Sequence, residues 1–275
     1  MFAKFNYTPS IPFYNMELNQ YQKLGSIIYS KHKKEVNDSL SDFITEEGII
    51  NGTALKNHWF SILKKDIFIS HSHKDINRVK AFAGWLKKNL GLEAFIDSCA
   101  WGYCDDLLRK IDDKYCYNSK TNTYNYNLRN YTTSHVHMML STALTEMIDN
   151  TECIIFFNTP NSINLSEELD NVKEKQSTIS PWIYHELSVS TMIQIKPPKR
   201  RSFILEHCDS IYSHSASSEL TISYDVSKQI KNMMDLSDSM LESWAQNYSK
   251  RSLSLNRHPL DYLYDIVFSK GESHN

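Results

Sequence analysis

Glycine is scarce in this sequence, with 7 in 275 residues. Neither a GxGxxG pattern nor GxxxxGK followed by Ser or Thr occurs, so the sequence contains no Rossmann-type pyrophosphate turn and no P-loop. The longest apolar run, Cys153–Phe157, is far too short to span a membrane. A nucleotide would therefore have to be held without a glycine-rich loop.

The sequence also has no large excess of positive or negative charge. Lys and Arg total 30 against 32 for Asp and Glu, a net charge of -2, so there is no basic field to attract nucleic acid. The first residues contain no continuous apolar segment and do not resemble a signal peptide. The 5 cysteines are odd in number and form no CxxC pair, which fits a reducing compartment better than secretion. We expect a cytoplasmic protein whose partners include neither nucleic acid nor a membrane.

Short β-branched and aromatic runs alternate with amphipathic helical patterns through the central part of the chain. This alternation predicts an α/β fold of the flavodoxin-like type, with a parallel five-stranded sheet and helical extensions at both ends. The expected strands are residues 66–70, 92–96, 152–157, 202–205 and 220–224.

The rest of the predicted organisation follows from composition and periodicity. The amino-terminal part is expected to be a helical extension that begins with an irregular arm. A segment rich in Tyr, Asn and Thr interrupts the main domain and is interpreted as an inserted loop. The predicted ranges are 1–60 for the extension (1–15 for the arm), 61–225 for the main domain, 117–133 for the insert, and 226–248 and 258–268 for helices in the carboxyl-terminal part, 226–275.

Polar side chains follow the predicted strands where each one ends. Ser70 and His71 follow the first strand, Asp97 the second and Asn158 the third. Because sites in such sheets form at the carboxyl ends of the strands, these residues are candidates for a binding site. The helix after the third strand starts at Pro181 and carries Trp182 and Glu186, whose spacing of four puts them on one face.

Three of these segments together resemble a TIR domain. They are the opening strand through His71, the second strand ending at Asp97, and the helix start Ser180–Leu187 with its Trp-x-x-x-Glu pair. The resemblance covers about residues 64–225 and is nearest to TIR proteins of bacterial antiphage systems, such as the TIR component of Thoeris. It does not extend to residues 1–60, and the insert departs from a minimal TIR domain.

The resemblance implies cleavage of NAD⁺ at the nicotinamide–ribose bond, with NAD⁺ as substrate and no cofactor. Residues 98–104 take the position of the family's BB loop, which gates the pocket and mediates TIR–TIR self-association. The resemblance also implies a phage-derived trigger and a separate effector that reads a nucleotide signal. The site residues that it implies are Glu186 as the catalytic group, with Ser70, His71, Asp97, Trp101 and Trp182 binding the substrate.

The chemistry is reasonable for a single carboxylate. Cleavage of an N-glycosidic bond passes through an oxocarbenium-like transition state, which a carboxylate beside the ribose stabilises. Nicotinamide is already cationic in NAD⁺, so it leaves as a neutral molecule and needs no general acid. Each site residue also has a structural interpretation: Trp182 as core packing, Ser70 and His71 as a helix cap, Asp97 as a turn residue, and Glu186 as a solvated helix residue.

Two other functions are compatible with the sequence. His71, His73 and Asp75 match the HxHxD start of a zinc hydrolase site. Ile76 stands where that family has histidine, the sheet is expected to be parallel, and the second HxH pair, starting at His135, lies on a helix whose alternate residues diverge. The other alternative is a TIR scaffold that assembles without catalysis.

Overall fold

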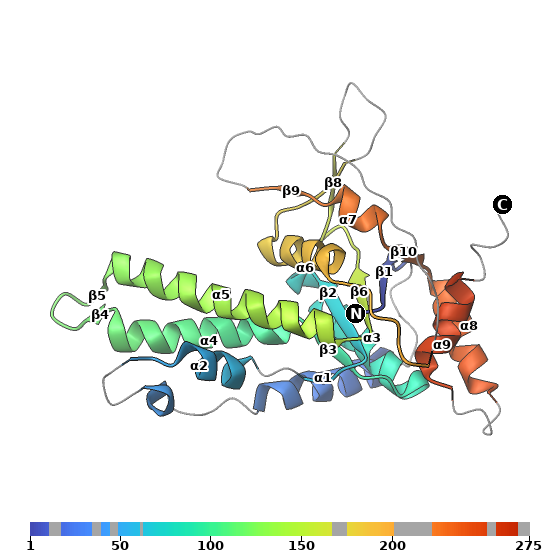
Figure 1. Ribbon diagram of the computed structural model, residues 1–275, viewed down its shortest axis with the longest axis horizontal. Coiled ribbons are helices and arrows are strands. Elements are labelled where there is room, and N and C mark those ends of the chain that lie inside the picture. The colour runs from blue at the N-terminus through green and yellow to red at the C-terminus, as the bar shows by residue number, and fades with distance from the viewer. Residues whose placement is uncertain are drawn as a thin grey trace.

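A five-stranded parallel sheet with helices on both faces forms the centre of the molecule (Figure 1). The computed structural model describes residues 1–10, 18–34, 40–44, 49–60, 63–166, 175–200, 222–251 and 257–268. The α/β class with a parallel five-stranded sheet is confirmed. In spatial order the strands are β10 (Met234–Leu236), β1 (Ala3–Tyr7), β6 (Cys153–Phe157), β2 (Ile67–His71) and β3 (Ala94–Ile96).

The amino-terminal residues form an inner strand of this sheet. β1 pairs in parallel with β6 from Ala3 opposite Cys153 to Tyr7 opposite Phe157. The prediction of an irregular arm over residues 1–15 is therefore wrong for this segment. Its side chains alternate as a strand requires, and Ala3, Phe5 and Tyr7 all enter the same core cluster.

The strand order differs from the flavodoxin-like order 2-1-3-4-5 in one respect. β2, β3 and β6 take the places expected of the first three strands, but the place beside β6 is occupied by β1. The segment predicted as a strand at 202–205 lies outside the described residues. Of the strand predicted at 220–224, residue 224 pairs instead in β9 (Tyr224–Asp225), in an antiparallel sheet with β7 (Asn164–Ser166) and β8 (Lys175–Thr178).

Alternate side chains of the strands feed two core clusters on opposite faces of the sheet. In β6, Ile155 and Phe157 join one cluster, and Ile154 and Phe156 join the other. The first face is covered by α1 (Leu18–Lys34), α3 (Ile76–Leu90), α8 (Asp238–Ser249) and α9 (Pro259–Phe268). The second is covered by α2 (Gly52–Trp59), α4 (Ser98–Tyr115), α5 (Tyr126–Asn150), α6 (Pro181–Met192) and α7 (Ser227–Lys231).

Two short 3-10 helices, η1 (Leu40–Phe43) and η2 (His73–Asp75), complete the described elements. The single helix predicted over 226–248 is divided into α7 and α8 by β10, and this prediction is wrong. The helix predicted over 258–268 is confirmed as α9. None of the described helices is long and apolar enough to cross a membrane.

Helices α1 and α3 cross at two glycines. A Cβ atom on Gly84 would lie 2.0 Å from the backbone oxygen of Tyr21, and one on Gly25 would lie 1.8 Å from that of Lys80. Only glycine allows the two backbones to approach this closely. The amino-terminal helix thus packs on the main domain, although its Ile27 is 55% exposed.

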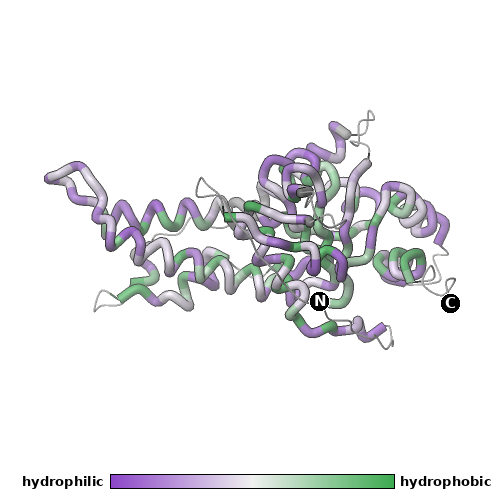
Figure 2. Tube along the Cα trace, turned by 90° about the horizontal axis from the view of Figure 1, so that it is seen from above, coloured by the Kyte–Doolittle hydropathy of each residue, from purple (hydrophilic) through white to green (hydrophobic). Residues whose placement is uncertain are grey.

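The longest pair of helices, α4 and α5, extends beyond the sheet as an arm, seen from two directions in Figures 1 and 2. Residues 98–104 form the first turns of α4, so the loop predicted there is wrong. The insert 117–133 is likewise more regular than predicted. It contains a hairpin of β4 (Tyr117–Asn118) and β5 (Thr123–Tyr124), after which Asn125 caps α5 through the backbone N–H of Leu128.

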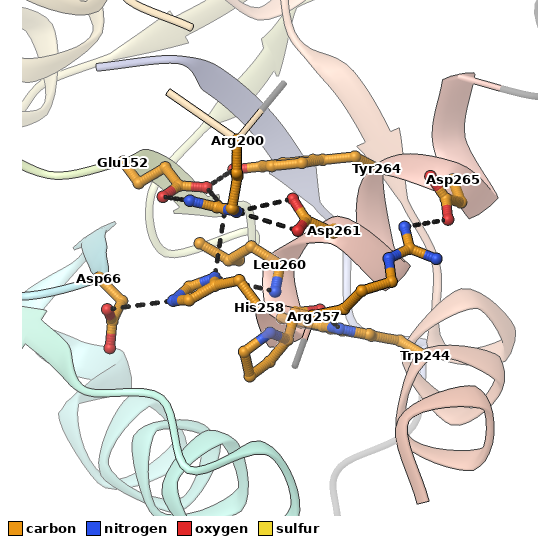
Figure 3. A network of polar contacts seen from close by, with 11 residues as sticks. Asp66, Glu152, Arg200, Trp244, Arg257, His258, Leu260, Asp261, Tyr264 and Asp265 are labelled. Carbon is orange, nitrogen blue, oxygen red and sulfur yellow. Dashed lines mark hydrogen bonds and ion pairs between the residues drawn. The ribbon is translucent and has the colours of Figure 1, made fainter. Parts of the chain in front are cut away.

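The carboxyl-terminal helices are fastened to the amino ends of the strands by a charged network (Figure 3). Arg200 donates to both carboxylate oxygens of Asp261 on α9, at 2.9 and 3.0 Å, and forms a two-pronged ion pair with Glu152 at the start of β6. Tyr264 donates to the same Glu152 carboxylate at 3.0 Å. Two strands outside the range 61–225, β1 and β10, and helix α9 are thus integral to the sheet domain.

Candidate functional site

The predicted site residues meet at the carboxyl ends of the strands. Ser70 and His71 end β2, Asp97 follows β3, and Glu186 reaches them from α6. β2 has β3 on one side and β6 on the other, so the chain crosses over in opposite directions from this strand. In open α/β sheets such a switch point is where ligands bind.

Successive side chains of β2 point to opposite faces of the sheet, and this alternation decides which of them faces α6. Phe68 belongs to the core cluster on the α5 and α6 face, whereas Ile67 and Ile69 belong to the cluster on the opposite face. Ser70, two residues after Phe68, shares its face and meets Glu186. His71 follows Ile69 on the other face, where the carboxyl group of Asp97 contacts it.

Helix α6 carries Glu186 on its inward side. The Ser180 side chain accepts a hydrogen bond from Ile183 N at 3.3 Å, and Pro181 takes the first helical position, as the sequence predicts. Ile183, Glu186, Leu187 and Ser190 are all buried, with the 3–4 spacing of a core-facing stripe. A carboxyl group thus stands in a position that an apolar side chain would normally fill.

The four polar side chains form one connected cluster. Ser70 Oγ donates to Glu186 Oε2 at 2.6 Å, although the two residues lie 116 positions apart. His71 N donates to Asp97 Oδ2 at 3.3 Å, and His71 Nδ1 lies 2.5 Å from Asp97 Oδ1 without the alignment of a hydrogen bond. All four residues are 0% exposed.

Burial displaces the ionisation of every titratable group in this cluster. It raises the pKa of Glu186 well above its ordinary value, the adjacent Asp97 raises it further, and the hydrogen bond from Ser70 opposes both effects. Burial also raises the pKa of Asp97 to about 7, despite hydrogen bonds with Glu186 and the His71 backbone that lower it. The pKa of His71 falls to about 4 through burial, so its imidazole is neutral at neutral pH.

Other predicted residues lie outside this cluster. Trp182 is half-buried one turn before Glu186 and contacts His137 of α5 edge-to-face, with ring centroids 5.6 Å apart. Asn158 donates to Asn6 of β1 at 3.0 Å. The side chain of Trp101 is outside the described part of the structure.

The residues of the zinc alternative have separate surroundings. His71 contacts Asp97, and His73 is exposed on η2. Asp75 accepts hydrogen bonds from Thr159 Oγ1 at 2.5 Å and Asn161 Nδ2 at 3.0 Å. Among the described residues, no three His, Cys, Asp or Glu side chains gather where they could hold a metal ion.

The contact between Asp97 and Glu186 was not foreseen from the sequence. Both residues were candidates, but nothing in their spacing predicted that the two carboxyl groups would be neighbours. One usable signal was present: Ile183, Leu187 and Ser190 define an inward stripe that includes Glu186, so a buried carboxyl group needing a polar partner was foreseeable.

Comparison with protein-family models, with curated proteins and with solved structures finds no match for this chain. Its function must therefore be argued from its own residues. A buried hydroxyl, two carboxyl groups and a neutral imidazole at a switch point can stabilise a developing positive charge and can hold or move a proton.

Proposed function

We propose that the protein is a TIR-type enzyme that cleaves NAD⁺ at the nicotinamide–ribose bond, with Glu186 as its catalytic residue. The observation that carries the proposal is the hydrogen bond from Ser70 to Glu186. It joins the first and third of the segments on which the resemblance rests, and it does so at the carboxyl end of β2. Asp97, from the second segment, completes the cluster.

In this proposal the carboxyl cluster supplies negative charge where the ribose becomes cationic. The nicotinamide–carbon bond breaks with its electron pair going to the nicotinamide nitrogen, so the leaving group departs neutral. The resulting oxocarbenium ion is stabilised by the carboxylate and then captured. Water yields ADP-ribose, a group of the same molecule yields a cyclic isomer, and another nucleophile yields a conjugate.

The burial of Glu186 sets a condition on this mechanism. A residue that is 0% exposed must be uncovered before it can touch a ribose. Helix α4 starts directly after Asp97, so displacement of its first turn would carry the Asp97 carboxyl away from Glu186. These first turns occupy the segment to which the resemblance assigns the gating role.

The biological role of the enzyme is proposed from the resemblance alone. This resemblance favours a cytoplasmic signalling enzyme of antiphage defence, which self-associates, responds to a phage-derived trigger and makes an ADP-ribose-derived nucleotide for a separate effector. Trp101 and Trp182 remain proposed pocket residues on the same ground.

Nicotinamide release by the purified full-length chain tests the activity. We expect release from NAD⁺ by the unchanged protein, measured by chromatography over a range of protein concentrations because self-association is part of the proposal. Glu186→Gln should reduce the rate on the order of 100-fold or more, since it removes the charge that acts in the transition state. Glu242→Gln, the same change at an exposed position on α8, is the matched control. An unchanged rate in Glu186→Gln contradicts the assignment.

A non-catalytic TIR scaffold is the second candidate. The complete burial of Glu186 favours it, because a catalytic group needs access to its substrate. The nicotinamide-release assay also distinguishes the enzyme from the scaffold. Absence of nicotinamide release by the unchanged protein at every concentration, together with concentration-dependent assembly in sedimentation, supports the scaffold.

A further inference from the structure

The cluster around Glu186 contains more acceptors than donors. If both carboxyl groups are ionised, Glu186 Oε1 has no hydrogen-bond donor among the described residues, and Asp97 Oδ1 has only the poorly aligned His71 Nδ1 at 2.5 Å. Ser70 Oγ donates to Glu186 Oε2, the backbone N–H of His71 donates to Asp97 Oδ2, and the backbone of Ser98 also donates to Asp97. Buried polar atoms left in this state are costly, about 1–3 kcal/mol each and more for charged groups.

Within the part of the chain that the structure describes, no lysine or arginine is among the groups that act most strongly on either carboxyl group. The groups that act most strongly on the ionisation of Glu186 are Asp97, Ser70 and His71, none of which is a lysine or arginine. Asp75 of η2 acts on His71, and Tyr29 of α1 interacts with Asp97. Cations lie one step further out: Arg78 lies 3.6 Å from Asp75, and Lys80 lies over the Tyr29 ring. Two like charges in contact without a counter-ion are strongly disfavoured in a buried site.

We propose that Asp97 and Glu186 hold one proton between them at neutral pH, so that the closed site carries a single negative charge and Asp97 is the positioning residue that fixes the Glu186 carboxyl group. The shared proton makes a hydrogen bond between the two adjacent carboxyl groups, which would otherwise face each other as two acceptors. It also removes one of two buried charges. The proposal describes the resting state of the site and rests on the proposed function only for its catalytic consequence.

Placing the proton on His71 instead would leave the same net charge but a different arrangement. The two adjacent carboxylates would both remain ionised, and the buried imidazole would become a cation. Burial disfavours that cation, which is consistent with the lowered pKa of His71. The pair therefore titrates as a unit, and a pKa value observed for it belongs to both residues.

The shared proton would also regulate catalysis. While Asp97 contacts Glu186, the carboxyl group of Glu186 holds a proton and is less able to stabilise a cation. Movement of Asp97 with the first turn of α4 would release the pair into solvent, where both groups ionise. The conformational step that admits a substrate would then also charge the catalytic group.

Infrared difference spectroscopy tests the shared proton without any substrate. The unchanged protein at pH 7 should give the carbonyl band of a protonated carboxylic acid, which shifts in heavy water. Both Asp97→Asn and Glu186→Gln should shift this band and change the pH at which it disappears, because each removes the partner that shares the proton while the remaining carboxyl group stays buried. Asp75→Asn should keep it, because this buried carboxyl group already has two hydrogen-bond donors, and it serves as the matched control.

Titration of the band in the unchanged protein covers the case in which a variant fails to fold. The band should persist at pH 7 and disappear at higher pH, well above the range of an ordinary carboxylic acid. Absence of the band at pH 7, or a band with the same frequency and the same titration in folded Asp97→Asn or Glu186→Gln as in the unchanged protein, overturns the proposal. The result does not depend on NAD⁺ cleavage, so a band without nicotinamide release removes only the proposed function.

Where nicotinamide release is measurable, its pH profile gives a further readout. The acid limb of the profile should move to lower pH in Asp97→Asn, because an amide N–H donated to Glu186 favours its ionised form. A purely structural role for Asp97 would lower the rate at every pH without moving this limb, and that result would contradict the shared proton.

Discussion

Carboxyl groups have different kinds of partners at the two ends of the parallel sheet. At the amino ends of the strands, Glu152 is paired with Arg200 and Glu93 receives hydrogen bonds from Lys65 and Lys87. At the carboxyl ends, Asp97 and Glu186 face each other and a neutral imidazole. The first arrangement is what stability alone would select. The second brings together buried carboxyl groups with raised pKa values, which is typical of functional sites.

The comparison extends to burial. The side chain of Arg200 is 31% exposed and that of Glu93 is 47% exposed, so water assists these pairs. Asp97 and Glu186 have no such contact with solvent. The cation of the Arg200 network and the Glu93 carboxylate are thus partly exposed, whereas both carboxyl groups of the proposed site lie in the core, where each change in ionisation has a larger energetic effect.

The largest expected change in stability comes from breaking the amino-end network. Arg200→Met should lower the free energy of unfolding by about 2–3 kcal/mol, because it leaves Glu152 and Asp261 without their cation. Urea denaturation of the purified protein measures this. A loss below about 0.5 kcal/mol, the range of an ordinary surface pair, would mean that the network contributes little.

The pH dependence of stability should differ between the two ends. The pKa of Asp97 is raised from 3.8 to about 7, so the folded state binds more protons than the unfolded state between these values. The contribution of Asp97 to stability is therefore full below pH 4 and is lost as pH rises through 7, by an amount on the order of a few kcal/mol, and the raised pKa of Glu186 extends this loss to higher pH. Denaturation at a series of pH values measures it, and Asp97→Asn should flatten the curve in this range. A curve of the same slope in that variant would contradict the prediction.

Substitution of glutamate by glutamine should have unequal effects at the two ends. Glu186→Gln should change the free energy of unfolding by no more than about 1 kcal/mol, because the amide can donate to Asp97 and removes a buried ionisable group. Glu152→Gln should be the more harmful change, at about 1–2 kcal/mol, since it weakens a pair that Arg200 requires. Thermal denaturation of the two variants side by side decides the order, and the reverse order would contradict the comparison.

The smallest effect is expected at Glu93. Its pKa is lowered from 4.5 to about 2 by hydrogen bonds from Lys65 and Lys87, so its contribution is present above pH 4.5 and is lost as pH falls towards 2. Because this side chain is about half exposed, Glu93→Gln should cost less than about 1 kcal/mol at pH 7. The difference from the unchanged protein should vanish near pH 2, and an equal difference at both pH values would exclude the ion pairs as its cause.

Part of the fold could be predicted because its signals are local. The strands that became β2, β3 and β6 were readable as short β-branched and aromatic runs, and Ser180 with Pro181 marked the start of α6. The first turns of α4 were misjudged as a loop, because the segment has no side-chain cap and contains Gly102. The strands β1 and β10 were missed because their sequences, AKFNY and MDL, interrupt the apolar residues with polar ones and form no β-branched or aromatic run; their pairing in the sheet makes them strands.

The sequence by itself determined that Ser70, Asp97 and Glu186 would follow or face strand ends, since a strand's carboxyl end and a helix's inward stripe follow from periodicity. Only the tertiary structure decided that the two carboxyl groups would be neighbours, that all water would be excluded from them, and that β1 would take the inner place in the sheet. The reason is that desolvation and mutual repulsion depend on every element packed around a group. The side chains of the site come from the end of β2, the residue after β3, and α6, and they meet only when the chain has folded.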